Sequence, residues 1–183
     1  MRNIANLALR LFAFMVAAGL CLGVTDLVTR DRIAEQTQIK AEEARRSVLD
    51  GEYEELVLAD NADESVKAVY KASKGGEVAG YVFEMNGTGF GGDIAVTVGI
   101  DAGGTITGVR IGSHGETAGL GARATEESFY GQYDGKNAEE LVVVKRDIQS
   151  PEEIKAITAA TITSKGVTAA VNQALAYFHQ NLE

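Results

Sequence analysis

An uncharged apolar stretch near the N-terminus constrains this chain more than any other feature. The residues from Leu11 to Thr25 carry no charge, and apolar residues continue on both sides of them. A helix that crosses a bilayer needs about 20 mostly apolar residues. Arg10 and Asp26 lie near the two ends of the span, where charged side chains can reach the lipid headgroups. The span therefore predicts a transmembrane anchor over residues 1–29.

A cleaved signal peptide is the competing interpretation, because Arg2 and Arg10 precede the apolar stretch as a basic leader would. However, no cleavage site of the small-x-small type follows Leu20, and a bulky Leu before Cys21 is a poor lipoprotein signal. The apolar span is also longer than the core of a typical signal peptide. We therefore expect a retained, single-pass membrane anchor.

The charge and the cysteine content exclude several classes of function. Residues 30–183 hold 15 basic and 25 acidic side chains, a net charge of −10, which repels nucleic acid. The single cysteine, Cys21, excludes disulfides within the chain and cysteine-ligated iron–sulfur clusters. With only His114 and His179, there is little material for a zinc site. Carboxylates could bind a harder ion, but we expect no metal. If the protein carries electrons, an organic cofactor must hold them.

The pattern after the anchor predicts a helical stalk over residues 30–50 and one α+β domain over residues 51–183. Residues 33–49 are charged and free of Gly and Pro, as a helix requires. Strand-like runs separated by Gly- and Asn-containing turns then predict a twisted, mostly antiparallel sheet covered by helices. These runs are Glu55–Leu58, Ser65–Lys71, Val78–Met85, Ile94–Ile100 and Thr105–Ile111.

The C-terminal third is predicted to add helices and one buried strand. We expect a short helix over Thr125–Tyr130, a buried strand over Leu141–Val144, and a helical turn over Glu152–Ala156 that starts at Pro151. A last helix, running to about His179, is indicated by apolar residues at three- and four-residue spacing. These residues are Val167, Val171, Leu175, Phe178 and Leu182.

Hydroxyl side chains are concentrated just before this last helix, at Thr158, Thr161, Thr163 and Ser164, with Lys165 beside them. The first turn of a helix has unpaired N–H groups and the positive end of the helix dipole, and both favour an anion such as phosphate. An ordinary N-cap is the simpler interpretation, because Ser and Thr are common capping residues. Spacing alone favours the cap.

The identity of these residues favours the phosphate interpretation. The segment Thr158-Ala159-Ala160-Thr161-Ile162-Thr163-Ser164-Lys165 resembles the flavinylation motif of covalent FMN-binding domains. In that family the last Thr of the motif forms a phosphoester with FMN, and it corresponds to Thr161. The resemblance implies that Thr158, Ala160, Thr163, Ser164 and Lys165 belong to the same site. Ala159 stands where the family usually has Gly, which can supply a tight turn or a positive φ.

A second segment, Ser113-His114-Gly115-Glu116-Thr117-Ala118-Gly119-Leu120-Gly121, resembles a Glu-Thr-Pro-Gly-Leu-Gly loop of the same family, with Ala118 in place of Pro. Without the family, its glycines indicate an ordinary surface loop. In the family this loop lies beside the flavin. The resemblance therefore implies a flavin pocket lined by Glu116, Thr117, Gly119, Leu120 and Gly121.

Together the two motifs are similar to those of the G subunit of Rnf-type ion-translocating electron-transport complexes, which are linked to ferredoxin and NAD. The resemblance implies an electron carrier with covalent FMN that has no turnover of its own. It also implies a flavin transferase for maturation and other membrane and redox subunits as partners. The location that it implies is a bacterial cell membrane, with the domain outside the cytoplasm. Two alternatives stay open: the C subunit of a sodium-pumping NADH:quinone reductase, and a non-redox membrane-anchored binding or sensor module.

Two further patterns are given less weight. The segment Gly87–Gly92 fits Gly-x-Gly-x-x-Gly but leads into a strand, which is the wrong context for NAD binding. Five aromatic residues could stack near a flavin ring, but core packing is the more frequent role for such side chains. They are Tyr81, Phe83, Phe90, Phe129 and Tyr130.

Overall fold

The computed structural model describes residues 2–59 and 63–182 and divides the chain into two compact units, Met1–Lys40 and Ala41–Glu183. The first unit is part of one long helix, α1 (Arg2–Val48). In the described part of the chain, α1 is the one helix long and apolar enough to cross a membrane, with a mean hydropathy of 2.2 over its most apolar window. Because α1 runs through both the predicted anchor and the predicted stalk, the boundary near residue 29 stays a prediction.

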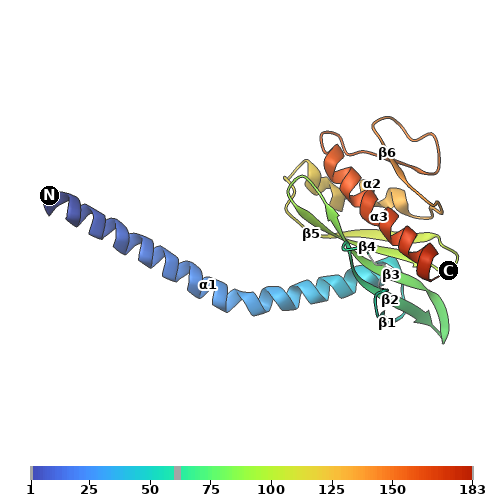
Figure 1. Ribbon diagram of the computed structural model, residues 1–183, viewed down its shortest axis with the longest axis horizontal. Coiled ribbons are helices and arrows are strands. Elements are labelled where there is room, and N and C mark those ends of the chain that lie inside the picture. The colour runs from blue at the N-terminus through green and yellow to red at the C-terminus, as the bar shows by residue number, and fades with distance from the viewer. Residues whose placement is uncertain (1, 60–62, 183) are drawn as a thin grey trace. The chain divides into compact units, whose positions relative to one another are not determined.

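The second unit is built on a five-stranded antiparallel sheet in the order β1-β2-β3-β4-β5 (Figure 1). Its strands follow one another along the chain as a meander, as the sequence predicted. They are β1 (Glu52–Leu56), β2 (Val66–Lys74), β3 (Glu77–Thr88), β4 (Asp93–Asp101) and β5 (Ile106–His114). The register is set by pairs such as Phe83 opposite Val98 and Val98 opposite Val109, whose side chains all lie in the core.

Helix α3 (Thr161–Asn181) packs on β3 and β4 and covers one face of the sheet (Figure 1). Four residues of its predicted apolar stripe, Val167, Val171, Leu175 and Phe178, are buried. The fifth, Leu182, follows the end of the helix and is partly buried against the core. Alternate residues of a strand point to opposite faces, so Gly99 faces away from α3. There a Cβ on Gly99 would lie 2.9 Å from the carbonyl oxygen of Val48. The last turn of α1 thus packs against the sheet face opposite α3, at a position where Gly99 has no side chain.

Shorter elements complete the domain between β5 and α3. They are two 3₁₀ helices, η1 (Gly121–Thr125) and η2 (Gly131–Tyr133), the helix α2 (Glu127–Tyr130), and a parallel pair of strands, β6 (Val142–Val144) and β7 (Glu153–Lys155). Two sequence predictions are wrong here. Glu153–Lys155 forms a strand instead of a helical turn, because it pairs with β6. The β6 region is only partly buried, since Val142 is 52% exposed.

Candidate functional site

A tight turn precedes α3 and contains the one described residue other than glycine with a positive φ. The N–H of Ala160 donates a hydrogen bond to the carbonyl oxygen of Ile157, at 3.0 Å, and Ala159 has φ +63°. A positive φ at the third position of a four-residue turn strongly favours Gly, because a Cβ is strained there. The conformation for which Gly is suited is therefore present at Ala159.

The four hydroxyls of this segment have different environments. Ser164 is fully buried; its hydroxyl accepts a hydrogen bond from the N–H of Ile157 at 2.9 Å and donates one to Ala160 O at 3.0 Å. Thr163 is also buried and donates to Glu116. Thr158 is exposed. The Thr161 hydroxyl, at the first residue of α3, has no hydrogen-bond partner among the described residues. Thr161 therefore offers an uncommitted hydroxyl.

The backbone around Thr161 is also uncommitted. The first intrahelical hydrogen bond runs from Ser164 N to Ala160 O, and the N-cap residue Ala160 offers no side-chain acceptor. Within the described residues, the N–H groups of Thr161, Ile162 and Thr163 consequently have no acceptor. Such N–H groups and the positive helix end favour an anion.

Glu116 connects three segments around this helix start. Its Oε2 accepts the Thr163 hydroxyl at 2.6 Å, and its Oε1 accepts the N–H of Gly91, in the β3–β4 turn, at 2.8 Å. Its own N–H donates to Nδ1 of His114 at 3.2 Å. Burial raises the pKa of the Glu116 carboxyl, but the hydrogen bonds from Thr163 and Gly91 outweigh it, so this pKa lies below its usual value. Glu116 is therefore an ionised acceptor at neutral pH.

These segments enclose a pocket of about 440 Å³ at the start of α3, a volume in the range of small-molecule sites. Seven predicted site residues line it: Glu116, Thr117, Leu120, Gly121, Ala160, Thr161 and Thr163. The structure places the other four outside its lining: Thr158, Ser164, Lys165 and Gly119. Two widely separated sequence motifs thus meet at one pocket.

Three further residues line this pocket, namely Phe90, Ala159 and Ile162. Core packing was the expected role for Phe90, and the structure contradicts it, because Phe90 is 77% exposed in the turn between β3 and β4. Phe83 and Phe129 do lie in the core. The signal that distinguishes Phe90 is its position between Gly89 and Gly91, since glycine on both sides indicates a turn and not a buried strand.

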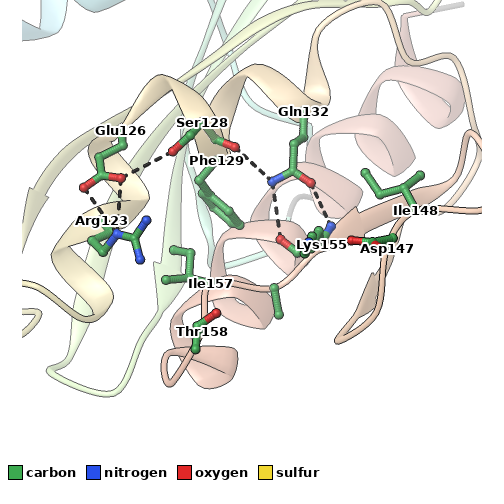
Figure 2. A pocket seen from close by; sticks show the side chains of 11 residues that line it. Arg123, Glu126, Ser128, Phe129, Gln132, Asp147, Ile148, Lys155, Ile157 and Thr158 are labelled. Carbon is green, nitrogen blue, oxygen red and sulfur yellow. Dashed lines mark hydrogen bonds and ion pairs between the residues drawn. The ribbon is translucent and has the colours of Figure 1, made fainter.

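A second, slightly larger pocket of about 470 Å³ includes Ile157 and Thr158 of the same turn in its lining (Figure 2). Its charged side chains neutralise one another. Arg123 Nε lies 3.2 Å from Glu126 Oε2, and Lys155 Nζ lies 2.6 Å from Asp147 Oδ1. The pocket beside Thr161 is the stronger candidate, because an uncommitted hydroxyl and unpaired helix N–H groups lie there.

Comparisons with known proteins show which proteins this chain is similar to. The model of the FMN-binding domain family matches residues 89–176, which include both motifs. The chain is 38% identical to the G subunit of the Na(+)-translocating ferredoxin:NAD(+) oxidoreductase complex of Acetobacterium woodii, over 97% of this chain and 92% of that protein. It is 41% identical to the G subunit of the proton-translocating ferredoxin:NAD(+) oxidoreductase complex of Clostridium ljungdahlii, over 65% of this chain and 66% of that protein.

A solved structure shares the fold. It is that of the C subunit of the Na(+)-translocating NADH-quinone reductase from Parabacteroides distasonis, with a TM-score of 0.58 and 25% identity. The match covers 77% of this chain and 81% of that one. This confirms the predicted α+β architecture, in which helices cover a mostly antiparallel sheet.

Proposed function

Because this chain belongs to the G-subunit family of ion-translocating ferredoxin:NAD(+) oxidoreductase complexes, we propose that it carries electrons on an FMN esterified to Thr161. The free hydroxyl of Thr161 beside a pocket of ligand size is the observation that supports this most directly. Bound FMN supplies the electron-transfer chemistry, and the protein supplies its position and surroundings. The chain is then one redox component of the complex and has no turnover alone.

The start of α3 suits the phosphate of such an ester. The three unpaired N–H groups and the helix dipole stabilise the negative charge that remains on a phosphodiester. Lys165 is exposed and lies four residues after Thr161 in α3. Residues at this spacing share one face of a helix, and the side chain of the later residue leans toward the earlier one. Lys165 can therefore approach the phosphate although it lies outside the pocket lining.

The pocket also suits an aromatic ring system. Apolar side chains from Phe90, Leu120 and Ile162 share its lining with the carboxylate of Glu116, the mixture of apolar wall and a few polar groups typical of cofactor sites. The predicted pocket residues Thr117 and Gly121 lie in the same lining. The ester thus attaches to Thr161 while the ring occupies the adjacent cavity.

We further propose a maturation enzyme, partner subunits and a membrane location for the chain. A flavin transferase forms the ester, other membrane and redox subunits exchange electrons with the FMN, and α1 holds the chain in the membrane. We place the FMN domain outside the cytoplasm. Two relatives whose similarity extends over nearly the whole chain are G subunits. This favours the ferredoxin:NAD(+) complex over the quinone reductase whose C subunit shares the fold.

The decisive variant is Thr161→Ala, made in the full chain coexpressed with a flavin transferase. It removes the ester oxygen, so we expect no covalent flavin, measured as fluorescence on a denaturing gel and as a mass gain of FMN minus water. Thr161→Ser keeps a hydroxyl at this position and should keep covalent flavin.

The matched control is Thr158→Ala, which removes an exposed hydroxyl three residues away and should only reduce flavin occupancy. Thr163→Ala should likewise reduce occupancy without abolishing it, because Thr163 acts through Glu116. Full in-gel fluorescence in Thr161→Ala, or peptide mapping of the flavin to another residue, would refute the assignment. A wild-type chain without flavin would favour the sensor alternative.

A further inference from the structure

The side-chain carboxamide of Gln132, in η2, bonds to both backbone groups of Lys155 on β7 (Figure 2). Its Oε1 accepts the N–H of Lys155 at 2.8 Å, and its Nε2 donates to the carbonyl oxygen of Lys155 at 3.3 Å. In an antiparallel ladder, a residue of one strand exchanges the same two kinds of bond with the residue opposite it. Gln132 therefore occupies the place of a residue from a neighbouring strand.

Lys155 presents its backbone groups on the outer edge of the two-stranded sheet formed by β6 and β7. On the inner edge, β7 and its flanks bond to β6 through the carbonyl oxygen of Glu152, at 2.8 Å, and the N–H of Ala156, at 2.7 Å. Backbone groups of alternate residues point to opposite edges of a strand, so those of Lys155 face away from β6. Such an edge is a template for a further strand once the side chain of Gln132 leaves it.

The outer edge of β6 is covered in the same way, but from inside the domain. Asn172 of α3 accepts the N–H of Leu141 at 2.9 Å and donates to the carbonyl oxygen of Leu141 at 2.9 Å. Leu141 is 2% exposed, so this edge is closed by the core. Lys155 is exposed and Gln132 is partly exposed. Hydrogen bonds that water can reach are exchanged at small net cost, so the β7 edge can open.

The second pocket, of about 470 Å³, lies along this edge, because Gln132, Lys155 and Ile157 all belong to its lining. Phe129 and Ile157 are buried and give it an apolar floor, while Ile148 is 44% exposed at its rim. The side chains of a strand point alternately to its two faces. A strand added to β7 could therefore place a side chain in this pocket, which is how strand-addition sites combine backbone bonds with selectivity.

The charges of this pocket indicate the chemistry of its occupant. Its two cations are each paired with a carboxylate, Arg123 with Glu126 and Lys155 with Asp147. The four charges sum to zero, although residues 30–183 carry a net charge of −10. Complementary charge is therefore not needed here, and an uncharged segment avoids leaving any of these groups beside a like charge.

We propose that the outer edge of β7 accepts an extended, uncharged segment of another subunit of the complex, and that Gln132 is a placeholder which this segment displaces. The inference rests on the proposed function, because it takes a subunit of the same complex as the partner. β7 spans three residues, so its edge alone gives a weak contact. A subunit held in the same assembly is present at a high effective concentration, an advantage that a second copy of this chain lacks.

The first test is photocrosslinking in the complete complex, purified from membranes. p-Benzoylphenylalanine replaces Ile148 in one variant and Val78 in the control, because Val78 is 40% exposed but lies on β3, outside the pocket lining. We expect the Ile148 variant to crosslink to another subunit, at one continuous segment located by peptide mapping. The Val78 variant should give no crosslink to that segment.

The outcomes of this test are distinct, provided that covalent flavin on Thr161 is measured in the same samples. The absence of a crosslink from the Ile148 variant, or a crosslink only to a second copy of this chain, would overturn the inference and leave the proposed electron carrier intact. The expected crosslink in a chain without flavin would support the strand site and overturn the proposed carrier.

The second test examines the edge itself, in the complex that carries the photoreactive residue at position 148. Lys155→Pro removes the N–H that an added strand needs, and we expect the crosslink yield to fall about tenfold. Lys155→Ala keeps this N–H while losing the ion pair with Asp147, and should crosslink like the parent. An unchanged yield in Lys155→Pro would overturn strand addition.

The placeholder role of Gln132 predicts the opposite sign from a structural role. Gln132→Ala removes the group that competes with the partner strand, so we expect the crosslink yield to rise about twofold. If Gln132 merely supported the local fold, the same variant would lower the yield. An unchanged or lower yield would therefore refute the placeholder, and this result decides the question even if Lys155→Pro fails to fold.

Discussion

At the scale of single residues, Ala159 carries a local strain that a substitution should relieve. Its φ of +63° costs an L-residue with a Cβ roughly 1 kcal/mol, and Gly avoids this cost. We therefore expect Ala159→Gly to stabilise the full chain by about 1 kcal/mol, measured by thermal unfolding in detergent.

The matched control is the same substitution in a helix. Ala169 is exposed in the interior of α3, where Ala→Gly costs about 1 kcal/mol. Ala169→Gly should therefore lower the stability. If Ala159→Gly also lowered it, the positive φ at this position would be refuted.

The sequence motifs predicted which residues belong to the site, but not how their side chains are oriented. Thr161 and Glu116 were predicted from motifs 45 residues apart in the printed sequence, and the structure brings both to one pocket. Spacing could not show which hydroxyl is available, because Ser164 points into the turn before the helix and Thr163 toward Glu116. Those directions depend on how α3 sits against loops that are distant in sequence.

At the scale of elements, the close approach of α3 to β3 depends on a glycine. A Cβ on Gly166 would lie 2.1 Å from the carbonyl oxygen of Thr88, in the backbone of β3. Ala has the better helix propensity by about 1 kcal/mol, but the clash should outweigh this gain. We expect Gly166→Ala to lower stability by about 2 kcal/mol or more, measured as a lower midpoint of thermal unfolding.

The control for Gly166→Ala is Gly23→Ala in α1, because nothing lies within 4 Å of a Cβ at Gly23. That variant should unfold at the wild-type midpoint or slightly above it. A Gly166→Ala protein as stable as the wild type would mean that α3 does not approach β3 so closely. The start of α3 holds Thr161, so the same variant should also reduce flavin occupancy.

Local patterns predicted the meander well and the C-terminal connection poorly. Each strand of the sheet pairs with its neighbour in the sequence, so turn signals and strand-like runs were sufficient. Residues 153–155 were expected to be helical after Pro151, yet they form β7, and Ile154 is fully buried. The pairing of β7 with β6 is parallel, and such pairing depends on the fold as a whole and not on a local run.

At the scale of the whole molecule, the sequence predicts an acidic domain held by one apolar helix. If that helix crosses the membrane once, the N-terminus and the domain lie on opposite sides of it. Residues 30–183 carry a net charge of −10, yet the basic residues near the anchor are poor guides to sidedness, because long domains are translocated largely regardless of them. Sidedness therefore has to be measured.

Single-cysteine labelling suits this chain because Cys21 is its one cysteine and lies in the apolar span. In a Cys21→Ser background, Val57→Cys places a thiol in the FMN domain, at a residue that is 97% exposed. Ile4→Cys places one at the N-terminal end of the predicted anchor, at a residue that is 73% exposed. If α1 crosses once and the domain lies outside the cytoplasm, a membrane-impermeant maleimide should label Val57→Cys in cells whose inner membrane is intact. Ile4→Cys should be labelled only after permeabilisation. The reverse pattern would place the FMN on the cytoplasmic side, and labelling of both variants in intact cells would contradict a single crossing.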